Sequence, residues 1–402
     1  MKILFVTPEF IEKNKPASGM PNYIYRTALF LQSLGHECFV VTGGRNNRLE
    51  QMSGLTIYRV NTLIPFAISG ISGYLLKKIM ADWKLQKKVR EICAQKKIEI
   101  IQYAGHSGTG LFHNSKKVNA AAVMRMSTYT KYYYACYEKE KRKLWTISAL
   151  ENMAAKRMNS VYAPSHVIAE AVSKNIGKRV GVIESPFYNE ICQEDNSVYS
   201  EKLMGIRYFL YFGGMDLHKG IFVISDMLNK LLLKYKNYYF VFCGSDPQGN
   251  IKKILEQNRQ VRDRIIWLGA QPHEKLYPII KNAELVVLPS LMENLSNACM
   301  EAMSFGKIVV ATDGTSYEQL IHDRVSGFLA KPGDAESLYQ KISEAMALTP
   351  DEKAFISEMA QKGMEMLRPE VAVKKLLCYY GRVISSFRHR NLKSGTAPEC
   401  NV

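Results

Sequence analysis

The sequence lacks the features that mark secreted, membrane-spanning and zinc-binding proteins. Its longest apolar stretch, "LIPFAISGISGYLL" (63–76), is interrupted by Pro and Gly and is too short to span a bilayer. The N-terminal "MKILFVTPEF" lacks a signal peptide's long apolar core and small-residue cleavage site, so it predicts a first buried strand. The eight cysteines include no Cys-x-x-Cys pair and no ligand-like His spacing, which predicts reduced thiols in a cytoplasmic protein.

Acidic residues are too few to balance the basic ones. The chain has 37 Asp and Glu against 54 Lys and Arg, giving a formal net charge of +17. An excess of this size predicts an anionic partner: nucleic acid, phosphorylated small molecules or an anionic membrane surface. No helix-turn-helix, RNA-recognition or zinc-finger pattern accompanies the charge, which argues against nucleic acid. Lys and Arg alternate with aromatic and apolar residues over 75–91 and 132–145. These stretches are either solvated helix faces or faces toward a membrane or an acidic acceptor.

Short apolar strands alternate with helical patterns along the whole chain, and its 402 residues are enough for two domains. The first series includes a helical stripe over 22–35. Its expected strands are 2–8, 38–43, 98–104, 121–127 and 160–165. The alternation restarts after residue 186, with expected strands at 207–214, 238–244, 264–269, 283–290, 307–312 and 327–331. The fold class predicted is therefore α/β, with two Rossmann-like, doubly wound parallel-sheet domains facing a cleft.

The composition also suggests domain boundaries. We expect an N-terminal domain over 1–186, a polar linker over 187–206 and a second domain over 207–368. A last helix over 369–388 is expected to pack back on the N-terminal domain, and the polar 389–402 to form a flexible tail. In open parallel sheets, ligands bind beyond the carboxyl ends of the strands. The strand-to-helix turns are therefore where chemistry is expected.

Two of these turns carry weak signals. The first ends in Ser18 and Gly19 and opens a helix, where glycine permits close backbone approach and the helix N-terminus offers N–H groups to an anion. A plain loop is an equally good interpretation. The turn "YFGGMDLHKGI" (211–221) places Gly213 at a strand end and Lys219 just before a helix. Lys219 would suit a phosphate, or would be a solvated surface side chain.

The most specific turn is "SLMENLSNACMEAMSFG" (290–306), which follows an expected strand and places Glu293 and Glu301 eight positions apart. Asn294 or Ser296 can cap the following helix, whose N-terminal N–H groups favour an anion such as a diphosphate. Carboxylates would repel phosphate, so they fit only if they accept hydrogen bonds from neutral hydroxyls of a sugar and a ribose. The alternative is an ordinary helix residue at Glu301 and a surface acid at Glu293.

The segment "PSLMENLSNACMEAMSFGKIVVATDGTSYEQLIHDRVSGFLAKPGDAESL" (289–338) resembles the signature of family 4 of the retaining, nucleotide-sugar-dependent glycosyltransferases, which have the GT-B fold. That signature is Glu, seven residues, Glu, then Ala-Met, a Gly and a downstream Glu. Its positions are occupied here by Glu293, Glu301, Gly306 and Glu318. The segments 18–42, 160–172 and 212–220 are similar to further motifs of the family. The resemblance covers nearly the full length of the chain. It implies that the N-terminal domain over 1–186 binds the acceptor and that the domain over 207–368 binds the nucleotide sugar.

The resemblance implies a role for each matching residue. Catalytic roles are implied for Glu293, which would contact the donor sugar, and for Lys219, which would hold the leaving phosphate. Donor binding is implied for Gly19, Gly213, the N–H groups of Leu295, Ser296 and Asn297, and the Glu301 carboxylate on the ribose. The chain contains no Asp-x-Asp, which is consistent with an enzyme that needs no metal and no cofactor besides its nucleoside-diphosphate-sugar donor.

Three positions depart from the family pattern. The family's Arg in the phosphate turn is Gly214 here, the first Gly of its N-terminal pair is Ser18, and a frequent His is Ser127. Arg125 and His106 are candidate substitutes for contacts in the cleft. A lone His is, however, more often structural.

The resemblance implies a retaining transfer of a sugar from a nucleotide donor to an acceptor hydroxyl, by a front-face substitution in which the leaving phosphate helps to remove the acceptor's proton. The expected acceptor is a glycan or lipid-linked glycan in cell-surface polysaccharide or glycolipid assembly, with the protein peripheral on the inner face of the membrane. The alternative is a catalytically silent nucleotide-sugar-binding subunit of a glycosyltransferase complex. The loop after Gly269 is expected near the base of the donor.

Overall fold

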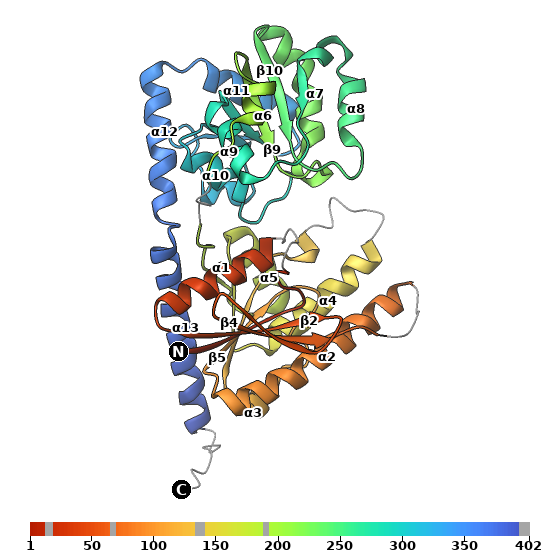
Figure 1. Ribbon diagram of the computed structural model, residues 1–402, viewed down its shortest axis with the longest axis vertical. Coiled ribbons are helices and arrows are strands. Elements are labelled where there is room, and N and C mark those ends of the chain that lie inside the picture. The colour runs from red at the N-terminus through yellow and green to blue at the C-terminus, as the bar shows by residue number, and fades with distance from the viewer. Residues whose placement is uncertain (13–18, 65–69, 133–140, 188–192, 394–402) are drawn as a thin grey trace. The chain divides into compact units, whose positions relative to one another are not determined.

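The computed structural model describes residues 1–12, 19–64, 70–132, 141–187 and 193–393 of the chain. The chain divides into two compact units (Figure 1). Unit 1 contains Met1–Pro186 together with Pro369–Val402, and unit 2 contains Phe187–Arg368. The α/β fold class predicted from the sequence is confirmed, because each unit is built on a largely parallel sheet with helices packed on it.

Unit 1 contains an eight-stranded sheet in the order β3-β4-β2-β1-β5-β6-β7-β8. All neighbouring strands are parallel except β3 and β4. The strands are β1 (Lys2–Thr7), β2 (Glu37–Gly44), β3 (Arg48–Met52), β4 (Leu55–Asn61), β5 (Ile100–Ala104), β6 (Ala121–Arg125), β7 (Ser160–Ala163) and β8 (Gly181–Val182).

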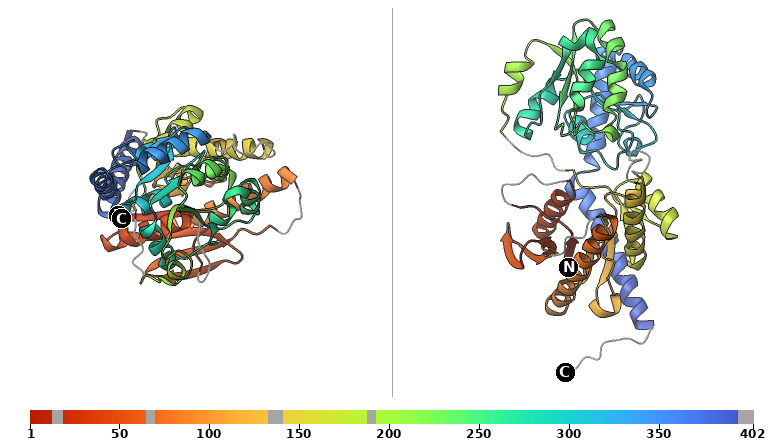
Figure 2. Two further views of the ribbon diagram at one scale, coloured as in Figure 1. Left: turned by 90° about the horizontal axis from the view of Figure 1, so that it is seen from above. Right: turned by 90° about the vertical axis from the view of Figure 1, so that its right-hand side faces the viewer.

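The two faces of this sheet are covered by different helices (Figure 2). The helices of unit 1 are α1 (Gly19–Ser33), α2 (Gly70–Lys96), α3 (Ser115–Val118), α4 (Lys141–Arg157), α5 (His166–Ile176) and α13 (Pro369–Lys393). Alternate residues of a strand point to opposite faces. Accordingly Ile3 and Phe5 lie in one apolar core with α1 and α13, whereas Leu4 and Val6 lie in another with α2, α4 and α5.

The structure differs from the sequence prediction at the end of the chain and in one hairpin. Helix α13 continues to Lys393, past the residue 389 at which a flexible tail was expected. Phe387 packs in the apolar core of unit 1, and beyond it Arg388 bonds Glu99 at 3.1 Å. The β3–β4 hairpin was not predicted, because its first strand is mostly polar. It is formed by a two-residue turn in which both Ser53 and Gly54 have positive φ, the geometry that suits tight hairpins.

Unit 2 contains a six-stranded parallel sheet in the order β11-β10-β9-β12-β13-β14. Its strands are β9 (Arg207–Phe212), β10 (Tyr238–Cys243), β11 (Ile265–Trp267), β12 (Leu285–Leu288), β13 (Val309–Thr312) and β14 (Phe328–Ala330). Its α-helices are α6 (Ser197–Lys202), α7 (Ile221–Lys234), α8 (Asn250–Gln257), α9 (His273–Asn282), α10 (Asn297–Ser304), α11 (Ala335–Met346) and α12 (Pro350–Glu365). Its 3₁₀ turns are η3 (Leu217–Lys219), η4 (Arg259–Arg264) and η5 (Ser316–Gln319).

Part of the segment predicted as a linker is ordered structure of unit 2. Helix α6 lies inside 187–206 and packs on α9. It is held there because Leu203 is fully buried in the core and the Asp195 N–H donates to the carbonyl of Glu274 at 2.8 Å. Residues 188–192 of the predicted linker lie outside the described part of the chain.

Among the residues that the structure describes, none forms a helix that combines the length and the apolar character needed to cross a membrane. The same residues contain no group of three or more His, Cys, Asp or Glu side chains arranged as metal ligands.

Candidate active site

The centre of the candidate site is an ion pair between two turns of unit 2. Lys219 ends the 3₁₀ turn η3 after β9, and Glu293 follows β12, the neighbouring strand. Nζ of Lys219 lies 2.6 Å from Oε2 of Glu293. Both side chains are largely buried, with 29% of Lys219 and 11% of Glu293 exposed. The pair lies at the carboxyl edge of the sheet, where ligands bind in open parallel sheets.

The backbones of the two turns also touch. The N–H of Leu291 donates to the carbonyl of His218 at 2.9 Å. Gly220 has φ of 73°, and a Cβ at this residue would overlap the carbonyl oxygen of Pro289. Glycine is therefore required at 220 for both its conformation and its space, and this close approach sets the position of Lys219 relative to Glu293.

Two hydroxyl groups that the sequence analysis missed orient the carboxylate of Glu293. The Ser290 hydroxyl donates to Oε2 at 3.4 Å and lies 3.1 Å from the hydroxyl of Tyr317. The N–H of Asn294 donates to Oε1 at 3.2 Å. Burial, and after it the charge of Glu293, raises the pKa of the Tyr317 hydroxyl well above its usual value, so it stays protonated. Their adjacency to the signature residues, with Tyr317 just before Glu318, is the signal that could have found them.

Helix α10 begins beside Glu293 as predicted, and Ser296 rather than Asn294 caps it. The Ser296 hydroxyl accepts from the N–H of Cys299 at 3.2 Å. The first N–H groups of a helix have no partner within the helix, and the cap occupies one of them. The dipole of this eight-residue helix therefore favours an anion at its start, among Leu295, Ser296 and Asn297.

Glu301 lies one turn into α10, and its Oε1 is 3.5 Å from Nε2 of His273. His273 begins α9, in the loop that the sequence analysis expected near the base of the donor. The same sheet edge carries Trp267, whose side chain is 46% exposed and whose Nε1–H donates to the Gly244 carbonyl at 3.1 Å. A Cβ at Gly244 would in turn overlap the carbonyl oxygen of Gly213, so this part of the edge is built from closely packed backbone.

Two further positions in unit 2 bear on the predicted roles. Burial, followed by the positive charge of Lys219, lowers the pKa of His218, so this ring is mostly neutral at pH 7. Glu318 hydrogen-bonds Asp313 at the end of β13, and both accept from the N–H of Gly314, at 3.0 and 2.7 Å. Their shared hydrogen bond raises the pKa of Glu318 and lowers that of Asp313.

The remaining candidates lie in unit 1. Gly19 is the first residue of α1 and is exposed, and a Cβ there would meet no atom within 4 Å. No contact described within the unit therefore requires glycine at this position. Ser18 lies outside the described residues. His106 follows β5, and Arg125 and Ser127 lie at the end of the adjacent strand β6. The structure thus places these three residues at one sheet edge.

Two buried acids that the sequence analysis missed hold the loop after β5. Asp82 of α2 accepts from the N–H groups of Gly110 and Phe112 at 2.7 and 2.9 Å. Glu151 of α4 accepts from the Thr130 hydroxyl at 2.7 Å and from the Ser107 N–H at 3.4 Å. Asp82 is the only acid between Lys77 and Arg90, a signal that could have found it. Glu151 has no comparable signal in the sequence.

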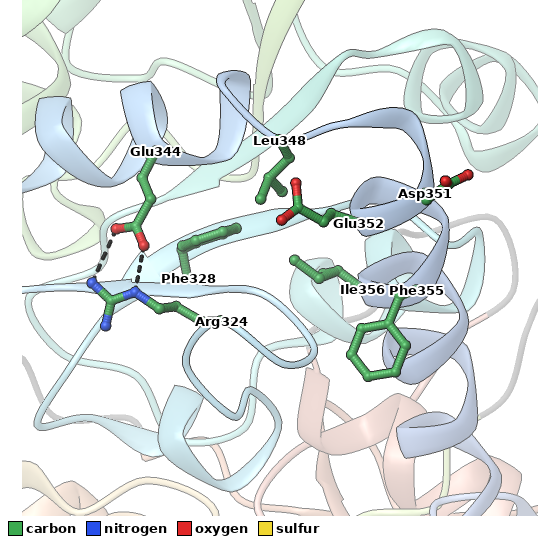
Figure 3. A pocket seen from close by; sticks show the side chains of 8 residues that line it. All are labelled: Arg324, Phe328, Glu344, Leu348, Asp351, Glu352, Phe355 and Ile356. Carbon is green, nitrogen blue, oxygen red and sulfur yellow. Dashed lines mark hydrogen bonds and ion pairs between the residues drawn. The ribbon is translucent and has the colours of Figure 1, made fainter.

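A separate pocket of about 500 Å³ opens in unit 2 where α11 ends and α12 begins (Figure 3). Phe328 begins β14, so the pocket lies at the amino edge of the sheet, opposite the Lys219–Glu293 edge. Two of its lining residues, Arg324 and Glu344, form an ion pair (Figure 3). Glu352 accepts from the Thr349 N–H at 2.8 Å as part of a capping box. No predicted site residue lines this pocket.

Two family models match the chain, one in each unit. Residues 194–362 match the model described as Glycosyl transferases group 1, and residues 17–186 match Glycosyltransferase Family 4. The chain belongs to the family 4 glycosyltransferases.

Its relatives and structural neighbours agree with this assignment. It is 20% identical to the phosphatidylinositol N-acetylglucosaminyltransferase gpi3 subunit of Schizosaccharomyces pombe, over 85% of this chain and 74% of that protein. It is 27% identical to the lipopolysaccharide 1,2-N-acetylglucosaminetransferase of Salmonella typhimurium, over 34% of this chain and 39% of that protein. The matches to two further bacterial relatives cover only 32% and 38% of those proteins.

The fold is likewise that of solved glycosyltransferases with the GT-B fold. The structure of Anabaena Alr3699/HepE in complex with UDP and glucose superposes with a TM-score of 0.69 at 16% identity, over 95% of this chain and all of that one.

Proposed function

We propose that the protein transfers a sugar from a nucleoside-diphosphate-sugar to an acceptor hydroxyl with retention of the anomeric configuration. The observation that carries this proposal is the Lys219–Glu293 pair beside the N-terminus of α10. A cation, a helix N-terminus and a carboxylate held by hydroxyl groups match the diphosphate and the hydroxyls of such a donor.

In this proposal the donor separates the ion pair. Its diphosphate lies against the N–H groups of Leu295, Ser296 and Asn297, and Lys219 turns from Glu293 to the phosphate bonded to the sugar. Glu293 is then free to accept hydrogen bonds from the donor sugar. Glu301, already beside His273, accepts from the ribose hydroxyls.

The chemical step breaks the bond between the anomeric carbon and the phosphate oxygen and forms one between that carbon and the acceptor oxygen on the same face. The acceptor's proton passes to an oxygen of the departing phosphate, so no protein nucleophile is required. Lys219 and the start of α10 stabilise the negative charge that develops on the leaving group. Since they supply the positive charge, we expect transfer to continue in the presence of a metal chelator.

The comparisons support a nucleotide sugar and a surface glycan as substrates. A structural neighbour is solved with UDP and glucose, and a relative is named for transfer in lipopolysaccharide. We propose an acceptor of this class, a glycan or a lipid-linked glycan, reached by a protein bound to the inner face of the membrane.

The elements proposed to touch the membrane are the helices α2 and α4, which pack together. Lys78 of α2 and Lys143 of α4 both lie over the ring of Tyr74, at 5.4 and 5.7 Å. Trp83 and Trp145 are 52% and 67% exposed on the same two helices. Basic and aromatic side chains together suit an anionic lipid surface.

The first test is a thermal-shift screen of nucleoside diphosphates, because a bound ligand raises the stability of the folded state. We expect one base to raise the melting temperature, and the corresponding sugar donors to be consumed with extracted cell-envelope glycans as acceptors. Proton NMR of the product then reports its anomeric configuration. A product of inverted configuration, or no stabilisation by any nucleoside diphosphate, would refute the proposal.

The alternative is a catalytically silent subunit that binds the nucleotide sugar. It is favoured by Gly214 and Ser127, which stand where the family has Arg and His, and by a relative that is itself named as a subunit. Stabilisation by a nucleoside diphosphate without consumption of any donor, by the protein alone, would favour this alternative.

A further inference from the structure

Two arginines are buried in the described part of unit 1, and they differ in what surrounds them. Arg59 is 4% exposed and Arg125 is 5% exposed. Arg59 donates from Nε to Glu50 at 2.8 Å and from Nη2 to the Ile11 carbonyl at 2.7 Å, and it lies 4.0 Å from Glu12. The charge of Arg59 is thus compensated within the unit, as a buried charge ordinarily is.

Arg125 has no such compensation. Its Nη2 donates to the Ser185 hydroxyl at 2.6 Å, its Nη1 donates to the Ser127 hydroxyl, and its guanidinium carbon lies 3.7 Å from the centre of the Tyr23 ring. Its Nε is buried and has no hydrogen-bond partner. Among the described residues, no carboxylate lies within the 4.0 Å of an ion pair. A guanidinium has five N–H donors, and the two hydroxyls accept only two of these bonds.

The burial of Arg125 destabilises the folded state unless another group accepts hydrogen bonds from its remaining N–H donors. A buried charge without a partner costs several kcal/mol, and a buried donor without an acceptor adds to that cost. The face of Tyr23 offsets part of it by a cation–π interaction. Ser185 accepts from Arg125 and therefore keeps its own O–H as a donor. The cluster of Arg125, Ser127 and Ser185 is therefore rich in hydrogen-bond donors and carries a positive charge, and no described carboxylate forms an ion pair with it.

The position of Arg125 in the fold is that of a ligand-binding residue. It is the last residue of β6, which lies between β5 and β7 in the parallel sheet, so its side chain starts from the carboxyl edge. The Gly105 N–H donates to the Arg125 carbonyl at 2.8 Å and so brings the loop of His106 to the same edge. Lys78 is close enough to lower the pKa of His106 after burial, although Glu9 opposes this effect.

We propose that Arg125, with Ser127 and Ser185, forms an anion subsite that binds a phosphoryl group carried by the acceptor. Several acceptor oxygens and a negative charge are needed to satisfy these donors, and a guanidinium fork pairs with two phosphate oxygens at once. A neutral sugar hydroxyl would leave the charge uncompensated. That the anion belongs to the acceptor rests on the proposed function, whereas the anion subsite itself does not.

A binding experiment on the full-length protein tests the subsite without turnover. The probe is glycerol phosphate, with glycerol as the uncharged control, and binding is measured by calorimetry for the wild type, Arg125→Gln and Lys219→Met. Because a charge-assisted hydrogen bond is worth more than about 1.4 kcal/mol, we expect Arg125→Gln to weaken glycerol phosphate binding by at least about tenfold. We expect Lys219→Met to keep the part of the glycerol phosphate binding that Arg125→Gln loses. Equal binding by Arg125→Gln and the wild type, or no binding by either, overturns the proposal.

A second comparison separates binding from folding. Arg125→Lys keeps the charge but not the planar fork, so its affinity should lie between those of the wild type and Arg125→Gln. If the only role of Arg125 is to hold Ser185 against β6, Arg125→Lys and Arg125→Gln lose thermal stability but bind glycerol phosphate with the affinity of the wild type. That result overturns the proposal. Nucleoside diphosphate binding should show the reverse pattern, weakened by Lys219→Met and not by Arg125→Gln. A failure of the donor site and a failure of this subsite are therefore distinguishable.

Vesicles identify the source of the phosphate. Phosphatidylcholine vesicles with and without phosphatidic acid are compared for the wild type and Arg125→Gln. Binding to phosphatidic acid that falls in Arg125→Gln supports the subsite and assigns it to a lipid headgroup. Binding to glycerol phosphate that depends on Arg125, without such a fall for vesicles, supports the subsite and assigns it to a water-soluble phosphorylated acceptor.

Discussion

Lys219 and Glu293 are 74 positions apart in the chain, yet Nζ of one lies 2.6 Å from Oε2 of the other. The pair connects the ends of two neighbouring strands, β9 and β12. Each charge is compensated by the other within the chain, so a ligand that takes Lys219 must also give Glu293 a new partner. A donor that carries both a phosphate and sugar hydroxyls does so.

The first prediction concerns Glu293→Gln and Lys219→Met. Glu293→Gln removes the proposed contact to the sugar but releases Lys219, so we expect transfer to fall by about a hundredfold or more while nucleoside diphosphate affinity stays equal or increases. Lys219→Met should weaken that affinity by about tenfold, the loss of one charge-assisted hydrogen bond. Calorimetry and steady-state transfer rates measure the two effects. Weaker nucleotide binding by Glu293→Gln would contradict the proposed exchange of partners.

The second prediction concerns Gly220→Ala. The new Cβ would overlap the Pro289 carbonyl, and the φ of 73° adds backbone strain. The free energy of unfolding should therefore fall by about 3 kcal/mol or more. Gly249→Ala is a matched control, because Gly249 has φ of 66° and open space around its Cβ position. Gly249→Ala should lower the free energy of unfolding only by the backbone strain, roughly 1–2 kcal/mol. Urea denaturation of both variants measures the difference. Equal decreases in the free energy of unfolding would show that the close approach of the two turns does not contribute to stability.

The third prediction concerns pH and Glu151. Burial raises the pKa of this carboxyl from 4.5 to about 7, against the opposing hydrogen bonds from Thr130 and Ser107. The folded state therefore binds a proton that the unfolded state has already released between pH 4.5 and 7, and folding stability falls as pH rises through this window. Glu151→Gln cannot titrate. Its stability relative to the wild type should increase between pH 5 and 7.5, by up to about 3 kcal/mol.

Thermal denaturation of the wild type and Glu151→Gln across this pH range checks the prediction. Glu336→Gln is the control, because Glu336 is an exposed acid paired with Lys230 and its pKa is lowered. An equal change of melting temperature with pH for the wild type and Glu151→Gln between pH 5 and 7.5 would contradict the raised pKa of Glu151.

The fourth prediction concerns the tryptophans. Trp83→Ala and Trp145→Ala together should reduce binding to anionic vesicles at low salt by about tenfold or more, since partial burial of two such rings is worth on the order of 2 kcal/mol. Trp267→Ala, which changes a half-exposed tryptophan of unit 2, should have little effect. Cosedimentation measures the bound fraction, and high salt should release the wild type. An equal loss of vesicle binding for Trp267→Ala would remove the support for a membrane contact through α2 and α4.

The sequence alone determined the alternation of strands and helices and the helix that starts at Asn297, and it limited the cap of that helix to Asn294 or Ser296. These features depend on residues within a few positions of one another, through hydrophobic period and local hydrogen bonds. The same local reasoning failed for the polar strand β3 and for α6. In β3 the turn at Ser53 and Gly54 decided the structure, and α6 is held by contacts with distant parts of unit 2.

Only the tertiary structure decided which side chains meet. The pairing of Lys219 with Glu293 and of Glu301 with His273, and the uncompensated burial of Arg125, follow from which strands are neighbours in a sheet. The physical reason is that charge compensation and burial depend on distances in space. Residues dozens of positions apart acquire such distances only when the sheet order is fixed.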